Sequence, residues 1–290
     1  MNKLDLVPPY CLIQSRHGWI LANVNDVYMG RSFVTYGECN EMELQFLLGL
    51  TQYPGLIVEV GANMGIHTVP LARALQSQGR RLVAFEPQPV VFQQLCTNLA
   101  LNGLMNVSAW PLACGEEPGV VTFAQPNYMQ TGNFGGVSMS RSTPGAGGAS
   151  VHVPCVRLDD MLQHVGVGLL KIDVEGFELK VLKGSKTILQ KSRPLLYVEN
   201  DRVDQSQELI AWLWKAQYNL WWHTPFLFNP QNFFGVTRNL YGVIRSFNML
   251  AVPREVNLGI PPQLAKVEDD AFHPLRALAP RLGAPNRVVA

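Results

Sequence analysis

The amino-acid sequence predicts an α/β fold, in which a mostly parallel β-sheet is covered by helices on both faces. Strand and helix patterns alternate along the central part of the chain, as repeated β–α–β units require. The strand segments are continuous apolar runs, such as LIVEV at residues 56–60, and such runs are typical of parallel strands buried on both faces. With 290 residues, the chain can bury one substantial core and a small appendage.

Residues 1–50 form a lead-in to this central unit. The segment GWILANVNDVYMG at residues 18–30 fits a short hairpin, and NEMELQFLLGL at residues 40–50 has apolar residues at helical spacing. A Tyr-Pro-Gly turn at residues 53–55 then precedes the first strand of the unit.

The central unit spans residues 51–253. Its predicted parallel strands lie at residues 56–60, 82–86, 106–112, 168–173 and 195–199. Its predicted helices lie at residues 66–77, 89–102, 176–190 and 205–217. An insertion at residues 116–156 separates the third strand from the fourth. Its flanks, VVTF and VHVPCV, fit a pair of strands, and its middle, TPGAGGAS, has the composition of a flexible loop.

The end of the chain contains two further strand patterns and a tail. NLWWHT at residues 219–224 and SFNMLAVP at residues 246–253 predict two strands, antiparallel at the sheet edge, with a long loop between them. The tail, residues 254–290, has many prolines and glycines and little periodicity, so we expect it to be extended or disordered.

The composition excludes several classes of protein. The chain is 47% hydrophobic and 16% charged, with a formal net charge of +1, so it lacks the basic stripe of a nucleic-acid-binding protein. No apolar stretch approaches the ~18 residues of a membrane span, and no signal-peptide core is visible, so we expect a cytoplasmic protein. The five cysteines form no C-x-x-C pair, which argues against a disulfide framework and a zinc site.

The most informative segment is IVEVGANMGIH at residues 57–67, where an apolar strand leads into a glycine loop and a helix. Gly61 and Gly65 allow close backbone approach and positive φ. The second strand ends on Glu86, whose carboxylate can accept two hydrogen bonds from a ribose diol. The loop lacks the G-x-G-x-x-G spacing that seats a pyrophosphate. Together with the acidic Glu59 in the first strand, this favours a cationic ligand without phosphate, such as S-adenosylmethionine.

Four motifs, VEVGANMGIHT, FEPQPVVFQQLCTNLALN, LKIDVEGFELKVLKG and YVEND, occur in an order that closely resembles the FkbM family of S-adenosylmethionine-dependent methyltransferases. The resemblance covers about residues 36–253. It implies the class I methyltransferase (Rossmann-like) fold, a seven-stranded sheet with helices on both faces. It also implies methylation of a hydroxyl group on a small-molecule or glycan acceptor, such as a sugar or a polyketide-like natural product.

The same resemblance implies roles for residues of the cofactor site. Glu59, Gly61, Asn63 and Gly65 would surround the methionine end of the cofactor, and Glu86 would hold the ribose. Many class I enzymes have an aspartate after the third strand that binds adenine. This chain reads PLACGEE there, so Ala113 could contribute only backbone groups to the adenine site.

Acidic and amide side chains also follow the fourth and fifth strands. Ligands of open α/β sheets bind at the carboxyl ends of strands, so we expect Asp173 to face the methyl group or the acceptor hydroxyl. Glu175, Glu199 and Asn200 are expected to contact the acceptor. Together with Asp201, these oxygens could hold a divalent cation, but nothing in the sequence sets that geometry, and no metal is predicted.

Two late segments supply further candidates. His223 can accept a proton near neutral pH, so it joins Asp173 as a candidate base or acceptor-orienting group; the alternative is a histidine packed at the sheet edge. Trp222 could stack on the apolar face of a sugar. Asn232 in the late loop is a candidate acceptor contact, and turn chemistry explains it equally well.

Two other functions fit parts of the pattern. A nicotinamide-dependent oxidoreductase shares the strand, glycine loop and distal acid, but it would need the pyrophosphate spacing that is missing here. A non-catalytic binding protein on a methyltransferase fold predicts a damaged glycine loop or lost carboxylates, and both are intact. Methyl transfer to nitrogen or carbon stays open, as do the acceptor and the oligomeric state.

Overall fold

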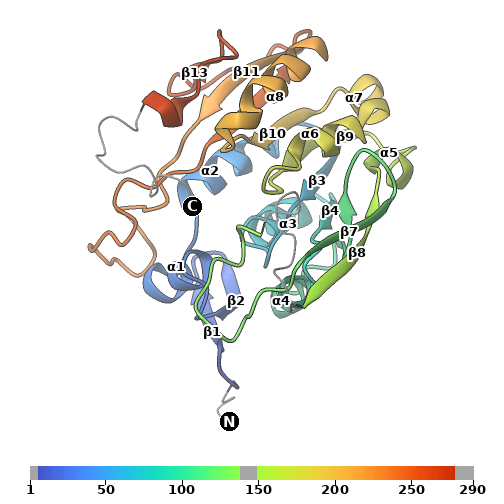
Figure 1. Ribbon diagram of the computed structural model, residues 1–290. Coiled ribbons are helices and arrows are strands. Elements are labelled where there is room, and N and C mark those ends of the chain that lie inside the picture. The colour runs from blue at the N-terminus through green and yellow to red at the C-terminus, as the bar shows by residue number, and fades with distance from the viewer. Residues whose placement is uncertain (1–5, 138–148, 278–290) are drawn as a thin grey trace.

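An eight-stranded, mostly parallel sheet forms the centre of the protein in a computed structural model that describes residues 6–137 and 149–277 (Figure 1). The strand order is β13-β11-β12-β10-β9-β3-β4-β5, and β12 runs antiparallel to both of its neighbours. The strands are β3 (Leu56–Val60), β4 (Leu82–Phe85), β5 (Val107–Trp110), β9 (Val167–Ile172), β10 (Leu195–Glu199), β11 (Tyr218–His223), β12 (Asn248–Pro253) and β13 (Ala265–Lys266). The predicted fold class is confirmed, with one strand more than the seven expected.

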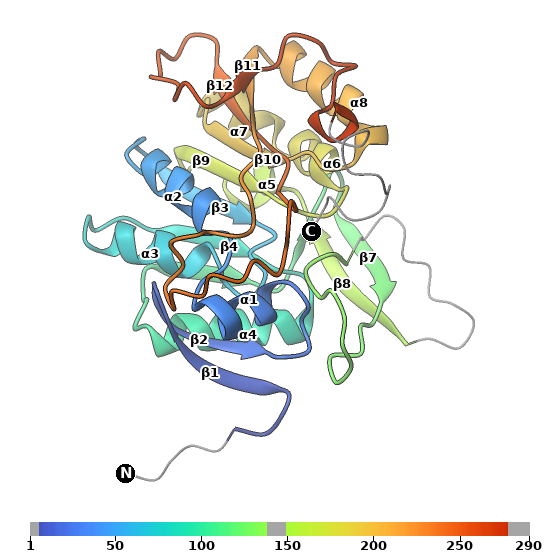
Figure 2. The same ribbon diagram turned by 90° about the vertical axis from the view of Figure 1, so that its left-hand side faces the viewer.

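Helices cover both faces of this sheet (Figure 2). They are α2 (Glu41–Leu50), α3 (Thr68–Gln76), α4 (Pro89–Leu101), α5 (Leu158–Met161), α6 (Glu178–Lys183), α7 (Lys186–Lys191) and α8 (Val203–Lys215), whereas α1 (Met29–Tyr36) packs against the strands of the lead-in. The core on one face includes residues of α2, α3 and α4, and the core on the other includes residues of α5 to α8. The single helix expected at residues 176–190 is two helices. They meet near Gly184, where a Cβ atom would lie 1.9 Å from the Gly115 carbonyl oxygen.

Alternate residues of each strand enter opposite cores. In β3, Ile57 belongs to the core under α2 and α3, whereas Val58 belongs to the core under α6 and α8. Glu59 therefore shares the face of Ile57, and its register partner in β9 is Lys171. The register thus places a carboxylate and an ammonium side by side inside the protein.

The lead-in begins with a β-hairpin, but this hairpin lies further upstream than the one predicted at residues 18–30. Its strands are β1 (Tyr10–Ser15) and β2 (Gly18–Asn23), so residues 18–23 are the second strand of the hairpin and pair with an upstream segment. Gly18, at φ 129°, allows the tight turn after Ser15. The remainder of the expected hairpin contains the start of α1.

The insertion forms a small second sheet, with the order β6-β8-β7. The predicted pair of strands is confirmed as β7 (Gly119–Ala124) and β8 (Ser150–Val156), which are antiparallel. β6 (Ala113–Cys114) pairs with β8, which takes Ala113 out of the main sheet. Most of the predicted flexible loop, residues 143–148, lies outside the described residues.

The described part of the tail packs against the main sheet. β13 pairs with β11, and the His273 Nε2 lies 2.8 Å from the Asn200 carbonyl oxygen. The expectation of an extended or disordered tail is therefore corrected for residues 254–277. Within the described ranges, no helix has the length and apolar character needed to cross a membrane.

Asn98 of α4 connects the hairpin to the loop that follows β3. Its Oδ1 accepts a hydrogen bond from the Leu21 N–H at 2.6 Å, and its Nδ2 donates to the Met64 carbonyl at 2.8 Å. We expect Asn98→Ala to lower the free energy of unfolding by about 1–3 kcal/mol, because it leaves these buried backbone groups unpaired. Urea denaturation measures this value. Thr97→Ala is the control, because that hydroxyl bonds within its own helix; equal effects of the two substitutions would contradict the assignment.

Candidate active site

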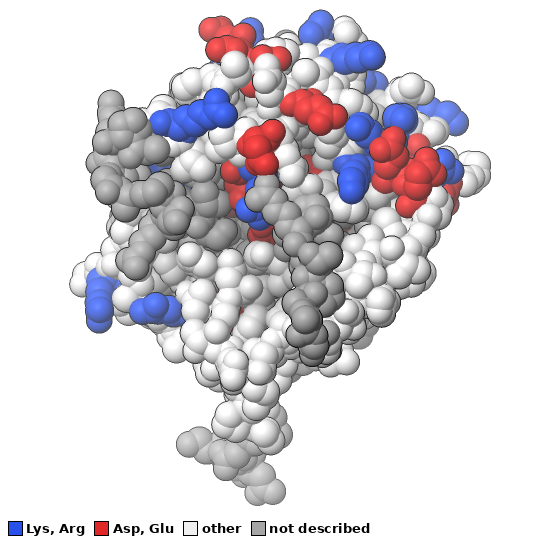
Figure 3. Space-filling model, in the orientation of Figure 1, with Lys and Arg blue, Asp and Glu red and all other residues white. Residues whose placement is uncertain are grey.

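A cavity lies at the carboxyl ends of β3, β4, β9 and β10, where the strand order reverses between β3 and β9. It encloses about 1160 Å³ of empty space, part of it open to solvent. Acidic side chains are visible in a hollow near the middle of this face (Figure 3). Its further walls come from the lead-in, the insertion and the late loop, and include Tyr28, Met29, Ser32, Phe123, Asn133, Val137, Leu227, Tyr241 and Phe247. A cleft at such a reversal is the usual ligand site of an open α/β sheet.

The glycine loop forms one wall of the cavity. Gly61 has φ 86°, and a Cβ atom there would lie 1.7 Å from the Asp173 carbonyl oxygen, so only glycine fits. Asn63 has φ 51°, and its Oδ1 accepts a hydrogen bond from the Met64 N–H at 2.7 Å. Both residues line the cavity. Gly65, at φ 95°, faces Leu95 instead, so its contribution is to the turn.

Glu86 is held rigidly at the end of β4. Its Oε2 accepts a hydrogen bond from the Asn63 N–H at 2.9 Å, and its Oε1 accepts one from the Gln88 N–H at 2.8 Å. Burial raises the pKa of Glu86 to about 7, although both backbone hydrogen bonds favour the ionised form. The carboxylate lines the cavity, and its remaining lone pairs are free to accept hydrogen bonds from two adjacent hydroxyl groups.

Gln88, two residues after Glu86, forms hydrogen bonds to two residues of the insertion. Gln88 donates from Nε2 to the Phe134 carbonyl at 2.9 Å, and its Oε1 accepts a hydrogen bond from the Tyr128 hydroxyl at 3.0 Å. These bonds hold the loop after β7 over the cavity. A contribution of the insertion to the pocket was expected, but the individual residues were not predicted, because the loop carries no recognisable sequence signal.

A buried lysine in the cavity wall was also not predicted from the sequence. Lys171 is 1% exposed, and its Nζ lies 3.1 Å from Asp173 Oδ2 and 3.5 Å from Glu59 Oε1. Burial disfavours its charge, but the carboxylates of Asp173, Glu59 and Glu43 outweigh burial and raise its pKa. Lys171 is therefore an ammonium that neutralises part of the acidic wall. A charged residue inside the apolar run GLLKID was the only signal for it.

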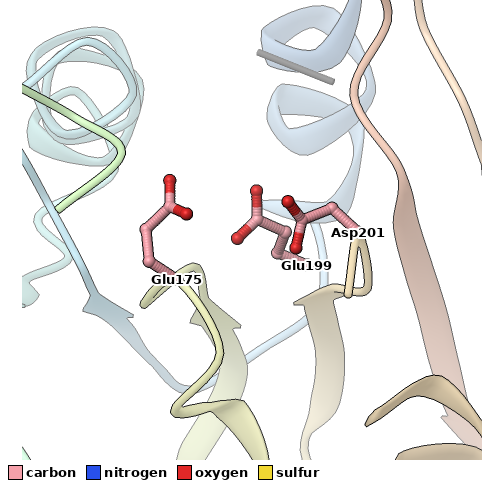
Figure 4. Close-up of side chains that lie close together, drawn as sticks. All are labelled: Glu175, Glu199 and Asp201. Atoms are coloured by element: carbon pink, nitrogen blue, oxygen red, sulfur yellow. The ribbon is translucent and has the colours of Figure 1, made fainter. Parts of the chain in front are cut away.

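Three further carboxylates converge beyond the ends of β9 and β10 (Figure 4). Oxygens of Glu175, Glu199 and Asp201 lie within 4.8 Å of one another. Arg202 contacts Glu175, and its Nε lies 3.3 Å from Asp201 Oδ1. Burial and the neighbouring carboxylates raise the pKa of Glu199 well above its usual range. The group can hold a cationic ligand, and Arg202 already supplies one positive charge.

Two predicted residues at the sheet edge do not line the cavity. The His223 Nδ1 lies 2.7 Å from the Tyr197 hydroxyl, and its ring packs 4.4 Å from that of Phe46. Burial lowers the pKa of His223 to about 4, so the ring is neutral. Trp222 packs 5.1 Å from the ring of His273. The packed alternative therefore describes His223, and its placement does not support a role as the base.

Three other candidates also lie outside the cavity wall. Asn200 donates from Nδ2 to the Ser206 hydroxyl at 2.9 Å. Asn232 hydrogen-bonds within its own loop, and its Nδ2 donates to the Val236 carbonyl at 2.7 Å. Ala113 is buried in β6. Each of the three is engaged in local structure, whereas Glu175 and Glu199 line the cavity.

Acidic side chains far outnumber basic ones in the cavity wall. Its carboxylates are Glu43, Glu59, Glu86, Asp173, Glu175, Glu199 and Asp201. Among the described residues, Lys171 is the only lysine or arginine that lines the cavity. Such a wall attracts a cation and repels phosphate. The side chains of this wall therefore fit a nucleoside sulfonium and do not fit a dinucleotide.

Comparison with known proteins points the same way. The model of the Methyltransferase FkbM domain matches residues 59–220, more than half of the chain. Methyltransferase sdnD of Sordaria araneosa is 31% identical over 156 residues, which are 44% of this chain and 59% of that protein. The 31-O-demethyl-FK506 methyltransferase FkbM of Streptomyces tacrolimicus is 29% identical over 191 residues, 56% of this chain and 72% of that protein.

A solved structure of a methyltransferase FkbM from Methylobacillus flagellatus KT superposes with a TM-score of 0.44 at 15% identity. The superposition covers 68% of this chain and 43% of that chain. The present chain thus spans about three-fifths of the first curated relatives and less than half of this structure.

Proposed function

The chain belongs to the FkbM methyltransferase domain family, and on that premise we propose that it transfers a methyl group from S-adenosylmethionine to a hydroxyl oxygen of a small molecule or glycan. Its sheet is the class I methyltransferase sheet, extended by β13. One observation carries the proposal: a glycine loop and the anchored Glu86 share a cavity whose wall, as far as the structure describes it, has seven carboxylates and one lysine. A phosphate-free cationic nucleoside suits that wall.

S-adenosylmethionine, when bound, supplies a methyl group that its sulfonium has already activated. The residues of the chain therefore act mainly by positioning, which can account for several kcal/mol of the barrier. Glu86 would hold the ribose hydroxyls, and Gly61 with Asn63 would form the adjoining backbone wall. Asp173 follows β9, on the other side of β3 from Glu86, where it would face the acceptor.

Two carboxylates at the acceptor end are suited to different tasks. Asp173 lies 3.1 Å from the Lys171 ammonium, and its carboxylate can orient a hydroxyl group by accepting its hydrogen bond. Glu199 has an Oε2 without a hydrogen-bond partner in the described structure, and a raised pKa. A carboxylate whose pKa is raised is a stronger base once it is ionised, so Glu199 is the candidate to take the hydroxyl proton.

The inference about the acceptor is based on the relatives of this chain. The name of the Streptomyces tacrolimicus relative specifies a 31-O-demethyl natural product, which supports oxygen as the methylated atom. We infer a hydroxylated acceptor of the sugar or polyketide class. Incubation with isotopically labelled S-adenosylmethionine and a panel of such acceptors, followed by mass spectrometry, tests this. Label on a hydroxyl oxygen is the expected product, and label on nitrogen or carbon would contradict oxygen specificity.

We expect Asp173→Asn to reduce turnover by about 10- to 100-fold, because the amide orients a hydroxyl group less well than a carboxylate. Affinity for S-adenosylhomocysteine should stay within about threefold, since the change leaves the Gly61 and Glu86 contacts in place. Steady-state kinetics on an acceptor from the panel, with calorimetry of the product complex, measures both quantities. Full turnover in Asp173→Asn would remove Asp173 from the acceptor site.

A further inference from the structure

The deep end of the cavity holds a buried histidine between two carboxylates. His67, just before α3, is 1% exposed, and neither ring nitrogen has a hydrogen-bond partner among the described residues. Its Nε2 lies 3.9 Å from Glu43 Oε1, and its Nδ1 lies 4.0 Å from Glu59 Oε1. Both separations are too long for direct hydrogen bonds. Glu43 and Glu59 are 3% and 1% exposed, and all three side chains line the cavity.

Within this group, Glu59 Oε1 and the His67 ring have no donor among the described residues, although Thr68 donates to the other Glu59 oxygen at 2.7 Å. Burial, and then the charge of Lys171, lower the pKa of His67, so the ring is neutral and offers one lone pair. Glu59 Oε1 has no hydrogen-bond partner in the described structure. Lys171, the cation beside it, is shared with Asp173. Buried acceptors of this kind are unfavourable unless a donor reaches them.

A primary ammonium matches this set of atoms. It has three N–H donors, one for each carboxylate and one for the imidazole lone pair, and its positive charge offsets part of the negative charge of the wall. A phosphate or carboxylate group would be repelled. A water molecule would satisfy hydrogen bonds but would leave the charge unbalanced.

We propose that Glu43 and His67, together with Glu59, bind the α-ammonium group of the methionine end of S-adenosylmethionine. The inference rests on the proposed function and extends it to α2, a helix of the lead-in. Glu59 lies two residues before Gly61 and His67 two residues after Gly65, so the glycine loop and this group of side chains are continuous. The lead-in would then help the enzyme to select a cofactor with an intact amino group.

The proposal also predicts that cofactor binding is linked to a proton. Burial raises the pKa of Glu43 to about 7, and Lys171 offsets part of this rise. The charged and polar groups that face Glu43 from the surrounding elements are Lys171, Asp173, His67, Tyr197, Ser246, Asn248 and Cys39. An ammonium favours the ionised form of Glu43. Below pH 7 binding must therefore release a proton from Glu43, and affinity should rise as the pH is raised from 6 to 8.

Calorimetric titration with two ligands tests the ammonium contact. The ligands are S-adenosylhomocysteine and its desamino analogue, in which hydrogen replaces the α-amino group. At pH 8 we expect the wild-type protein to bind the analogue about 10- to 100-fold more weakly. Glu43→Gln should weaken S-adenosylhomocysteine about tenfold and leave the analogue within about twofold. The ligand comparison on wild-type protein needs no variant, so it stands even if Glu43→Gln folds poorly.

Glu41→Gln is the matched control. Glu41 lies on the same helix and is similarly buried, but it binds His17 at 2.8 Å and Gln45 at 2.6 Å and is absent from the cavity wall. Both ligands should bind this variant as they bind the wild type. Titrations at pH 6.5 in two buffers of different ionisation enthalpy then measure proton release. Glu86 also titrates near this pH and is present in both proteins, so the difference between wild type and Glu43→Gln isolates Glu43.

The outcomes separate this inference from the function on which it rests. Equal affinity of the wild type for both ligands would overturn the ammonium contact while leaving the cofactor assignment intact. So would a loss in Glu43→Gln that is the same for both ligands, because it would show a structural role alone. Binding of neither ligand by folded wild-type protein would overturn the proposed function and the ammonium site together.

Discussion

Glu86→Ala is expected to weaken S-adenosylhomocysteine binding by at least about 100-fold. Two charge-assisted hydrogen bonds to the ribose hydroxyls would be lost, each worth about 1.5–3 kcal/mol. The same change releases the Asn63 and Gln88 N–H groups that the carboxylate anchors at 2.9 and 2.8 Å. The glycine loop and the residue that fastens the insertion would both lose a contact. Isothermal calorimetry at pH 8 measures the affinity.

Glu86→Gln is the informative companion to this change. The amide keeps the size of the side chain and one acceptor oxygen, so we expect an intermediate loss, about tenfold. Circular dichroism of both variants shows whether the fold is retained. If Glu86→Ala were folded and bound S-adenosylhomocysteine as tightly as the wild type, Glu86 would have no place in the ribose site.

Lys171→Met is expected to lower the free energy of unfolding by about 3–5 kcal/mol, because removing one partner leaves the buried Glu59 and the half-buried Asp173 without their counter-charge. Asp173 and Glu59 both lie within 3.5 Å of the Lys171 ammonium. At roughly 2–4 °C per kcal/mol for a domain of this size, the melting temperature should fall by about 6–20 °C. Differential scanning calorimetry measures the shift.

Lys183→Met serves as the control for this substitution. Lys183 lies 3.6 Å from Glu208 in an ion pair whose acidic side chain is 71% exposed, and such surface pairs contribute little. The control should change the free energy of unfolding by no more than about 0.5 kcal/mol. A Lys171→Met protein as stable as Lys183→Met would show that the buried carboxylates need no counter-ion.

The elements that carry the cofactor site were predictable because local pattern and tertiary structure agree there. An apolar strand, a glycine loop and a helix must follow one another in this order to form a β–α–β unit, and the positive φ angles of Gly61 and Gly65 follow from the same loop. Glu86 was predictable from its position 21 residues after Gly65, at the end of the second strand. The alternation of apolar strands with helical spacing likewise predicted β3, β9 and β10 to within one residue.

Contacts that depend on strand register were not predictable in this way. Glu59 and Lys171 are adjacent only because β3 and β9 pair in one particular register, and Glu43 reaches them only because α2 packs on that face of the sheet. His223 shows the converse. Its chemistry suits a base, but packing against Phe46 and Tyr197 holds it outside the cavity wall. The same reason accounts for β13, a short edge strand that pairs with β11, which lies far earlier in the chain.

The central claim is that this acidic cavity binds a nucleoside with a sulfonium or thioether in place of a dinucleotide. Calorimetric titration of the purified protein with S-adenosylhomocysteine and, separately, with NADH tests it most directly. We predict saturable binding of S-adenosylhomocysteine at one site per chain and no heat of binding from NADH. A folded protein that binds NADH, or that leaves S-adenosylhomocysteine unbound, would contradict the claim.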